Sequence, residues 1–313
     1  MKRLLVLRLS ALGDVIHTIP AVTALREANP GAQISWVVEA PYRELVEIVA
    51  GVEAIPVRMK RWSQEPRTAL ASIRSLRGAG TSVDFQGLIK SAVLGWLSGA
   101  KERFGFDRDA VREKPALLFT NRKIAIDTTK HVIDQNVELA AAVIGPMGPM
   151  GEKGQEASCG GNWDTFAQAK GLEALAGSVV LLPGAGKPSK LWPVDHFRAL
   201  ARRIGPEALV VWGPGERELA EAIGARMAPP TNLRELAWVL KNARVVIGAD
   251  TGPLHLAVAL GTPVIGLYGP TDPRRNGPYG QLDRVINRFH STKLMDSISV
   301  EDVVTMLGKV TGE

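Results

Sequence analysis

The chain has 313 residues, of which 45% are hydrophobic and 22% are charged, and its formal net charge is +6. This length predicts about two domains, and the composition is that of a soluble globular protein without an apolar run long enough to span a membrane. The single cysteine, Cys159, excludes an internal disulfide and is typical of a reducing compartment, so we expect a cytoplasmic protein.

The first half of the chain alternates short apolar runs with stretches of helical spacing. We expect strands at 4–9, 34–38, 54–57 and 82–85, and helices at 15–28, 42–50, 69–76, 89–97 and 132–144. Arg8 interrupts the first apolar run, which favours a buried strand over a signal peptide. The segment 99–129 is less regular. This alternation predicts the beginning of a doubly wound parallel sheet.

The middle of the chain, 145–161, is rich in glycine and proline and has no hydrophobic period. Such a segment is typical of an interdomain linker. We therefore predict one domain over 1–150 and a second over 151–313.

The second half repeats the alternation. We expect strands at 179–182, 209–212, 245–247 and 264–267, and helices at 163–170, 194–203, 216–226, 233–241, 252–260 and 300–308. The predicted fold class is α/β, with two Rossmann-like, doubly wound parallel-sheet domains facing a cleft. Ligands of such sheets bind beyond the carboxyl ends of the strands, so the loops that follow strands are the places to look for chemistry.

One such loop is the turn Asp250-Thr251-Gly252, which lies between an apolar run and a stretch of helical spacing. The unpaired N–H groups at a helix start and the helix dipole favour an anion such as phosphate. The Thr251 hydroxyl and His255 lie beside them. A well-capped crossover helix without a ligand explains the same pattern equally well, so both interpretations stay open at this point.

The loop after the strand at 179–182 contains small residues and Lys190. Small residues let a ligand approach the backbone closely, and a lysine neutralises a phosphate. A dinucleotide fingerprint is incomplete here because Ser189 replaces its third glycine, and a P-loop fails because Pro188 follows Lys187. A loop without a ligand is the alternative.

Two acidic residues stand at predicted helix starts. Glu216 either caps its helix or accepts hydrogen bonds from ribose hydroxyls. Asp14 either stabilises its helix or acts as a general base toward a hydroxyl nucleophile. His17, one turn further, is a second candidate for the base, although a lone helix histidine is more often structural.

Six basic residues between Arg58 and Arg77 are accompanied by Glu65 alone. This surplus is either a solvated helix face or a surface that attracts an anionic partner. Nucleic acid is a poor fit because aromatic interleaving and the known binding motifs are missing. The histidines are scattered and no serine-hydrolase elbow is present, so we expect neither a protein-held metal nor a serine triad.

With these loops assembled, the chain resembles the bacterial lipopolysaccharide heptosyltransferases, which are inverting, metal-independent glycosyltransferases of the GT-B fold. The resemblance covers nearly the whole chain and is carried by three motifs: LRLSALGDVIHTIP at 7–20, LPGAG continuing to KLWP at 182–193, and DTGPLHLA at 250–257. The segments 84–91 and 103–106 are more similar to heptosyltransferase I than to heptosyltransferase II.

The resemblance implies transfer of heptose from ADP-L-glycero-D-manno-heptose to the Kdo sugar of Kdo-lipid A, by a peripheral enzyme on the cytoplasmic face of the inner membrane. It implies that Asp14 is the general base, that Glu216 holds the ribose and that Asp250 contacts the heptose. The implied phosphate contacts are Lys190, Thr251, Gly252, Leu254 and His255, with backbone N–H groups at Ala185 and Gly186 where the best-known heptosyltransferase I has hydroxyl residues. The implied acceptor contacts are Gly13, Arg58, Lys60 and Arg61.

The resemblance further implies no cofactor and a last helix that crosses back to the first domain, and we expect a monomer. Three alternatives stay open: a sugar-nucleotide 2-epimerase of the same fold, a heptosyltransferase II-like enzyme that adds the second heptose, and a nucleotide-binding module without catalysis.

Overall fold

The computed structural model describes residues 3–62, 64, 66–144, 162–169 and 171–312. The chain forms two compact units, Met1–Asn162 and Trp163–Glu313. The predicted linker at 145–161, and with it the predicted boundary between 150 and 151, lies outside the described residues.

The first unit is built on a six-stranded parallel sheet with the order β3-β2-β1-β4-β5-β6. Its strands are β1 (Arg3–Leu7), β2 (Gln33–Glu39), β3 (Val52–Val57), β4 (Thr81–Asp84), β5 (Glu102–Phe106) and β6 (Arg122–Ile124). β1 pairs with β2 on one side and with β4 on the other, so Leu7 lies opposite both Val37 and Asp84. After β1, the strands β2 and β3 are added toward one edge of the sheet, and β4, β5 and β6 are added on the other side of β1. The strand order therefore reverses between β1 and β4.

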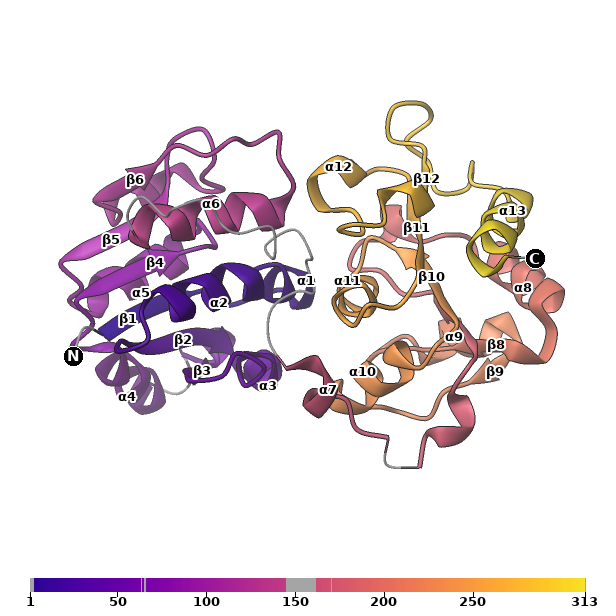
Figure 1. The fold of residues 1–313 in the computed structure, drawn as a ribbon, viewed down its shortest axis with the longest axis horizontal. Helices are drawn as coiled ribbons and strands as arrows, with labels where there is room; N and C mark the ends of the chain where they lie inside the picture. The colour runs from indigo at the N-terminus through magenta and orange to yellow at the C-terminus, as the bar shows by residue number, and fades with distance from the viewer. Residues whose placement is uncertain (1–2, 63, 65, 145–161, 170, 313) are drawn as a thin grey trace. The chain divides into compact units, whose positions relative to one another are not determined.

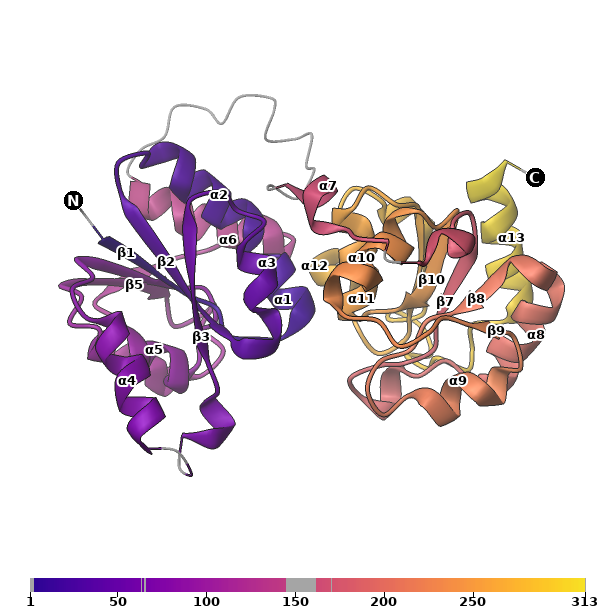
Figure 2. The ribbon, with the colours of Figure 1, turned by 90° about the horizontal axis from the view of Figure 1, so that it is seen from below.

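This reversal decides which face each helix covers. Right-handed crossovers place the helices before the reversal on one face and those after it on the other. The helices are α1 (Leu12–Ile16), α2 (Ile19–Ala28), α3 (Arg43–Val46), α4 (Pro66–Leu76), α5 (Ile89–Leu97) and α6 (Val132–Ile144), with short 3-10 turns η1 (Ala40–Tyr42), η2 (Met59–Arg61) and η3 (Lys114–Leu118). Figure 2 shows α4 and α5 on one face and α2 and α3 on the other. α6 follows the last strand and is therefore not a crossover helix, and it packs against α2 on the face of α2 and α3.

Three expectations for this unit differ from the structure. The predicted helix at 42–50 is only the four-residue helix α3. The predicted helix at 15–28 is two helices, because the chain breaks between Ile16 and Ile19 and Pro20 opens the first turn of α2. The irregular segment 99–129 contains the strand β5, the edge strand β6 and the turn η3.

The second unit repeats the architecture (Figure 1). Its strand order is β12-β11-β10-β7-β8-β9. Its strands are β7 (Val179–Leu182), β8 (Ala208–Val210), β9 (Arg226–Met227), β10 (Val245–Ala249), β11 (Val264–Tyr268) and β12 (Val285–Asn287). β7, β8, β10 and β11 are buried along their whole length, as strands covered on both faces must be. Here the reversal lies between β7 and β10.

Helices complete the second unit, and the last of them packs on this unit itself. They are α7 (Trp163–Phe166), α8 (Val194–Ile204), α9 (Arg217–Ile223), α10 (Leu233–Lys241), α11 (Gly252–Ala259), α12 (Pro273–Asn276) and α13 (Val300–Thr311), with turns η5 (Glu173–Leu175), η6 (Pro188–Lys190), η7 (Gly205–Glu207) and η8 (Leu282–Arg284). Val303 of α13 is fully buried in the core shared with α8 and the sheet, and Val304 and Leu307 pack against it. This differs from the crossing to the first unit that the resemblance implied.

The predicted fold class is confirmed as two parallel-sheet α/β domains of six strands each. Each sheet has a topological switch point, where loops leave neighbouring strands in opposite directions and leave room for a ligand. In the first unit this place lies after β1 and β4, and in the second after β7 and β10.

Candidate functional site

At the switch point of the first unit, the Asp14 carboxylate forms an ion pair with a buried arginine. Asp14 lies in the first turn of α1, and its Oδ1 is 2.6 Å from Nη2 of Arg8, the residue that follows β1. The Arg8 side chain is only 2% exposed, whereas that of Asp14 is 25% exposed. The buried Arg8 guanidinium therefore holds the Asp14 carboxylate on its protein-facing side, and the other side of the carboxylate is open to solvent.

A second guanidinium, from Arg112, approaches Asp14 from the exposed side. Its Nη2 and Nη1 donate to Oδ1 and Oδ2 of Asp14 at 3.1 and 3.2 Å. This is the bidentate geometry that makes arginine–carboxylate pairs strong. The Arg112 side chain is 36% exposed, so of the two arginines it is the one with room to move.

These contacts set the charge of Asp14. Burial raises the pKa of the Asp14 carboxyl, but the neighbouring Arg8 and Arg112 guanidinium groups outweigh burial and hold that pKa below its ordinary value. Burial also lowers the pKa of Arg8 to about 10, which still leaves the arginine charged at neutral pH. The structure thus holds Asp14 as a carboxylate, the form that a general base needs.

The loop after β4 anchors Arg8. Nη1 of Arg8 donates to the Phe85 carbonyl, and the Gln86 side chain accepts from the Leu9 N–H at 2.7 Å. Asp84, at the end of β4, accepts from the Gln86 N–H at 2.8 Å and from the Ser91 hydroxyl at 2.9 Å. Burial raises the pKa of Asp84 to about 6 despite these bonds. Asp84 therefore organises the loop and is too buried to meet a substrate.

His17 is not placed like a catalytic base. Its side chain is 5% exposed and its ring meets that of His131 edge to face, with 5.6 Å between centroids. Asn136 of α6 donates to the His17 carbonyl at 3.0 Å. These contacts tie the break between α1 and α2 to α6, so the role of His17 is structural.

The predicted acceptor residues divide into two places. Gly13 adjoins Asp14 in α1. Arg58 and Arg61 are exposed after β3, at the sheet edge and two strands away from β1. The side chain of Lys60 lies outside the described part of the structure.

The switch point of the second unit holds a network around Asp250, which follows β10. Lys190 Nζ lies 2.5 Å from Asp250 Oδ2, His255 Nε2 lies 3.0 Å from Oδ1, and the Asn276 amide donates to Oδ1 at 2.8 Å. The Asp250 side chain is only 5% exposed, and that of Lys190 is 20% exposed. The sequence singled out Lys190, Asp250 and His255, and the structure brings all three together.

This network stabilises the ionised form of Asp250. Burial raises the pKa of the Asp250 carboxyl, but the hydrogen bonds and charges of His255 and Lys190 outweigh it and hold that pKa far below its ordinary value. Burial raises the pKa of the Tyr268 hydroxyl, and the nearby Asp250 carboxylate raises that pKa further. Lys190 therefore lies at the carboxyl ends of the strands, where the buried Asp250 carboxylate holds its ammonium group in place.

The start of α11 is open to an anion. Thr251 is its N-cap residue, but the hydroxyl makes no capping bond. Among the described residues, Thr251 Oγ1 is buried without a hydrogen-bond partner. Helix starts leave their first N–H groups without partners in the helix, here those of Gly252 and Leu254, since Pro253 has none. An unmatched hydroxyl beside free N–H groups suits a phosphate.

Glu216 lies against the loop that follows β7. It is the N-cap residue of α9, and its Oε2 accepts from the Gly213 N–H at 2.8 Å. A Cβ added to Gly184 would stand 1.9 Å from Glu216 Oε1, so only glycine lets the carboxylate lie across this loop. A Cβ at Gly186 would meet nothing within 4 Å, so the loop is open beside Gly186.

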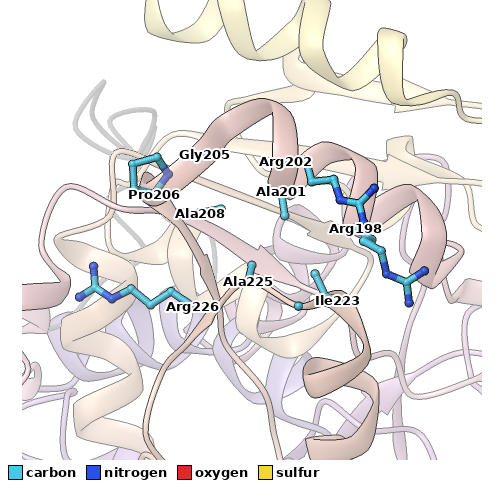
Figure 3. A pocket seen from close by; sticks show the side chains of 10 residues that line it. Arg198, Ala201, Arg202, Gly205, Pro206, Ala208, Ile223, Ala225 and Arg226 are labelled. Atoms are coloured by element: carbon cyan, nitrogen blue, oxygen red, sulfur yellow. The ribbon is translucent and has the colours of Figure 1, made fainter.

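A separate pocket of about 260 Å³ lies at the opposite, amino edge of the second sheet, near the start of β8 (Figure 3). Arg198, Arg202 and Arg226 line it. Arg198 donates to the Ala222 carbonyl and Arg226 to the Ala174 carbonyl, so two of the three guanidinium groups already have backbone partners. This pocket takes no part in the switch-point site.

Sequence reasoning missed three partners of the site. In the sequence, Arg8 only interrupts an apolar run. A cation within a run that forms a buried strand nevertheless indicates that a carboxylate partner is buried beside it. Arg112 and Asn276 gave no signal in the sequence, because their partners are 98 and 26 positions away.

Over the described residues, no group of three or more His, Cys, Asp or Glu side chains is placed to hold a metal ion. None of the described helices is long and apolar enough to cross a membrane.

Two parallel-sheet α/β units, with a carboxylate at the switch point of one and an uncapped helix start at the switch point of the other, have the architecture of a two-domain glycosyltransferase. Comparison with known proteins gives the family. Residues 69–301 match the model of glycosyltransferase family 9 (heptosyltransferase). The chain belongs to this family and is a heptosyltransferase.

Individual relatives agree with this assignment. The chain is 33% identical to lipopolysaccharide heptosyltransferase 1 of Escherichia coli K12, over 90% of this chain and 92% of the relative. It is 25% identical to lipopolysaccharide heptosyltransferase 2 of the same strain, over 91% and 87%. Its fold is similar to the solved structure of E. coli heptosyltransferase WaaC with ADP-2-deoxy-2-fluoro heptose, with a TM-score of 0.79, 29% identity and coverage of 98% of this chain and 99% of that one.

Proposed function

We propose that the protein transfers heptose from ADP-L-glycero-D-manno-heptose to the Kdo sugar of Kdo-lipid A, as the first heptose of the lipopolysaccharide inner core. The observation that carries the proposal is the ionised Asp14, held open to solvent at the first switch point by Arg8 and Arg112. The proposal of the first rather than the second heptose rests on the higher identity to heptosyltransferase 1 than to heptosyltransferase 2.

The donor binds to the second unit in this proposal. The diphosphate lies at the start of α11, on the N–H groups of Gly252 and Leu254 and on the Thr251 hydroxyl, with Lys190 as the neighbouring cation. What supports this is the buried Thr251 Oγ1, which has no partner in the described structure, and the fixed position of Lys190. Glu216 accepts hydrogen bonds from the ribose hydroxyls, and its place across Gly184 supports that role.

The remaining residues of the proposed binding site for the sugar-nucleotide donor have supporting roles. The N–H groups of Ala185 and Gly186 face the diphosphate, where the best-known heptosyltransferase I has hydroxyl residues. Asp250 and His255 act mainly by holding Lys190, because both side chains are buried. A contact of Asp250 with the heptose requires the donor to reach the 5% of its side chain that is exposed.

The reaction is a single displacement with Asp14 as the base. The oxygen of the acceptor hydroxyl forms a bond to the anomeric carbon of the heptose while Asp14 takes its proton. The bond from that carbon to the phosphate oxygen breaks, and ADP leaves with the electron pair, so the anomeric configuration inverts. The charge that develops on ADP is stabilised by Lys190 and the α11 start, and no metal is needed for this step.

The acceptor binds to the first unit. Gly13 lets it approach Asp14, and Arg58, Lys60 and Arg61 attract its phosphates and carboxylates. The exposure of Arg58 and Arg61 after β3 supports this assignment. We further propose that the enzyme works as a monomer without a cofactor, in the cytoplasm and at the inner membrane surface.

A transfer assay tests the function. The enzyme is incubated with Kdo-lipid A and a panel of ADP-, UDP- and GDP-sugars, and products are identified by mass spectrometry. We expect addition of one heptose from ADP-heptose alone. Conversion of a UDP-sugar to its 2-epimer without an acceptor supports the epimerase alternative instead, and transfer only to an acceptor that already carries heptose supports a second-heptose enzyme. Tight ADP binding with no reaction supports a module without catalysis.

A further inference from the structure

Exposed apolar side chains are concentrated on one layer of the first unit. Among the described residues, six large apolar side chains are strongly exposed, and four of them lie on α4, α5 and η3. These are Leu70 (48% exposed), Ile89 (40%), Trp96 (53%) and Leu118 (83%). We call the outer face of α4, α5 and η3 the α4–α5 surface.

The spacing of α5 explains why its outer face is apolar. Ala92, Leu94 and Gly95 face the sheet, and a Cβ at Gly95 would meet Leu7 of β1 at 3.0 Å. Ile89 and Trp96 are seven positions apart, which is about two helical turns, and both point outward. A helix with apolar residues on both faces buries the second face against something else.

The neighbouring segments extend this face. η3 packs on α5, and the Phe119 ring that follows η3 lies 6.0 Å from the Trp96 ring. α4 lies beside α5 on the same face of the sheet (Figure 2). The exposed apolar side chains of the three segments therefore belong to one layer.

The charge of the layer is of one sign. The segments 66–77, 89–101 and 114–119 contain no Asp or Glu, and their basic residues are Arg67, Arg74, Arg77, Lys90, Lys101 and Lys114. The acids that directly border these segments are Glu65, Glu102 and Glu113, and two of them have partners in the structure. Glu102 pairs with Arg122 at 2.9 Å, and Glu113 accepts from the Ile89 N–H at 2.7 Å.

We propose that the α4–α5 surface docks on the surface of an anionic phospholipid bilayer. Trp96 and Leu118 enter the headgroup region, where aromatic and aliphatic side chains are stabilised, and the six cations pair with lipid phosphates. A second copy of the chain is a poor occupant, because it would place the two sets of cations against each other. The inference rests on the proposed function, since an enzyme that glycosylates a lipid meets that lipid at a membrane.

Vesicle sedimentation tests the proposal. The full chain is mixed with vesicles of phosphatidylglycerol and phosphatidylethanolamine, or of phosphatidylcholine alone, at low and at high salt. We expect binding to the anionic vesicles that weakens with salt. The double variant Trp96→Ala/Leu118→Ala should bind at least about tenfold more weakly, because it loses the apolar anchors. Lys90→Glu/Lys101→Glu should lose binding at low salt as well.

A matched control comes from the second unit. Leu282 and Leu294 are the other two strongly exposed apolar side chains, 47% and 57% exposed, and Leu282→Ala/Leu294→Ala should bind vesicles like the wild type. Thermal melting checks that all variants are folded. Equal binding by the wild type and Trp96→Ala/Leu118→Ala overturns the proposal, as does a wild type that ignores anionic vesicles.

Two further measurements separate the possible failures. Sedimentation velocity showing a dimer that Trp96→Ala/Leu118→Ala dissociates would make the surface an interface between copies and overturn membrane docking. Heptose transfer to a lipid-free Kdo acceptor should be the same for the wild type and this variant. Transfer without vesicle binding overturns only the docking, whereas vesicle binding without any transfer overturns only the proposed function.

Discussion

Arg8 and Asp14 form an ion pair of 2.6 Å in which the arginine is buried and the aspartate reaches solvent. The pair joins the end of β1 to the first turn of α1, at the point where the first sheet changes direction. A buried arginine that holds the carboxylate of the proposed base fixes both its position and its charge. Its removal should therefore change the chemistry more than the fold around it.

The first prediction concerns Arg8 itself. Arg8→Met keeps most of the buried volume but leaves Asp14 with Arg112 as its only cation, so the pKa of Asp14 should rise toward or above its ordinary value. The acid limb of the pH profile of kcat should move up by about one pH unit or more. At neutral pH Asp14 stays ionised, but kcat should still fall at least about tenfold, because the carboxylate loses the group that fixes its position.

Arg8→Lys is the matched variant, because it restores a buried cation without the second hydrogen-bonding arm. It should recover part of the activity and move the acid limb back. An unchanged profile in Arg8→Met, with the protein folded by thermal melting, would show that Arg8 does not act through Asp14.

The second prediction concerns pH and Asp84. Its pKa of about 6 in the folded chain lies above the value of 3.8 for a free aspartate, so the folded state binds the proton more tightly than the unfolded state. Stability should therefore fall as pH rises from about 4 to 7, by roughly 3 kcal/mol from this group. Asp84→Asn removes the titration and keeps an acceptor for the Gln86 N–H.

Urea unfolding at several pH values checks this. Relative to the wild type, Asp84→Asn should gain stability as pH rises through this window. Parallel stability curves for the two proteins would contradict the assigned titration.

The third prediction is steric. Gly184→Ala places a Cβ 1.9 Å from the Glu216 carboxylate and must displace it. We expect ADP affinity, measured by calorimetry, to fall about tenfold or more, through lost ribose contacts. In Glu216→Ala the obstacle is gone, so Gly184→Ala should add almost nothing in that background. Fully additive effects would mean that Gly184 acts independently of Glu216.

The fourth prediction tests Lys190. Lys190→Met removes the cation beside the proposed diphosphate and leaves the buried Asp250 with His255 and Asn276. ADP affinity should fall by about tenfold to a hundredfold, and the free energy of unfolding by about 1–3 kcal/mol. Affinity for adenosine, which has no phosphate, should stay the same. A parallel loss of adenosine binding would indicate general damage to the site.

The sequence predicted the α/β class and the loops of both switch points, because these depend on long apolar runs and on helix starts. It missed β5, which lies in the irregular segment 99–129. It also missed β6, β9 and β12, which are edge strands of two or three residues and too short to show a period. Their pairing is set by the neighbouring strand and not by their own residues.

The site was predictable to the same extent. Lys190 and Asp250 both follow buried strands, and parallel strands bring such residues to one edge. Arg112 reaches Asp14 from a segment without regular structure, which local patterns cannot place. The helix at 15–28 was predicted as continuous because its apolar spacing runs through His17, although Pro20 marked the start of a second helix.

The central claim is that Asp14 is the base of a heptose transfer, and Asp14→Asn tests it most directly. The variant keeps the size of the side chain but cannot accept the proton. ADP-heptose binding and single-turnover transfer to Kdo-lipid A are measured on the same preparation. The account predicts binding within about threefold of the wild type and a transfer rate reduced at least about a thousandfold. Transfer at the wild-type rate by Asp14→Asn would contradict it.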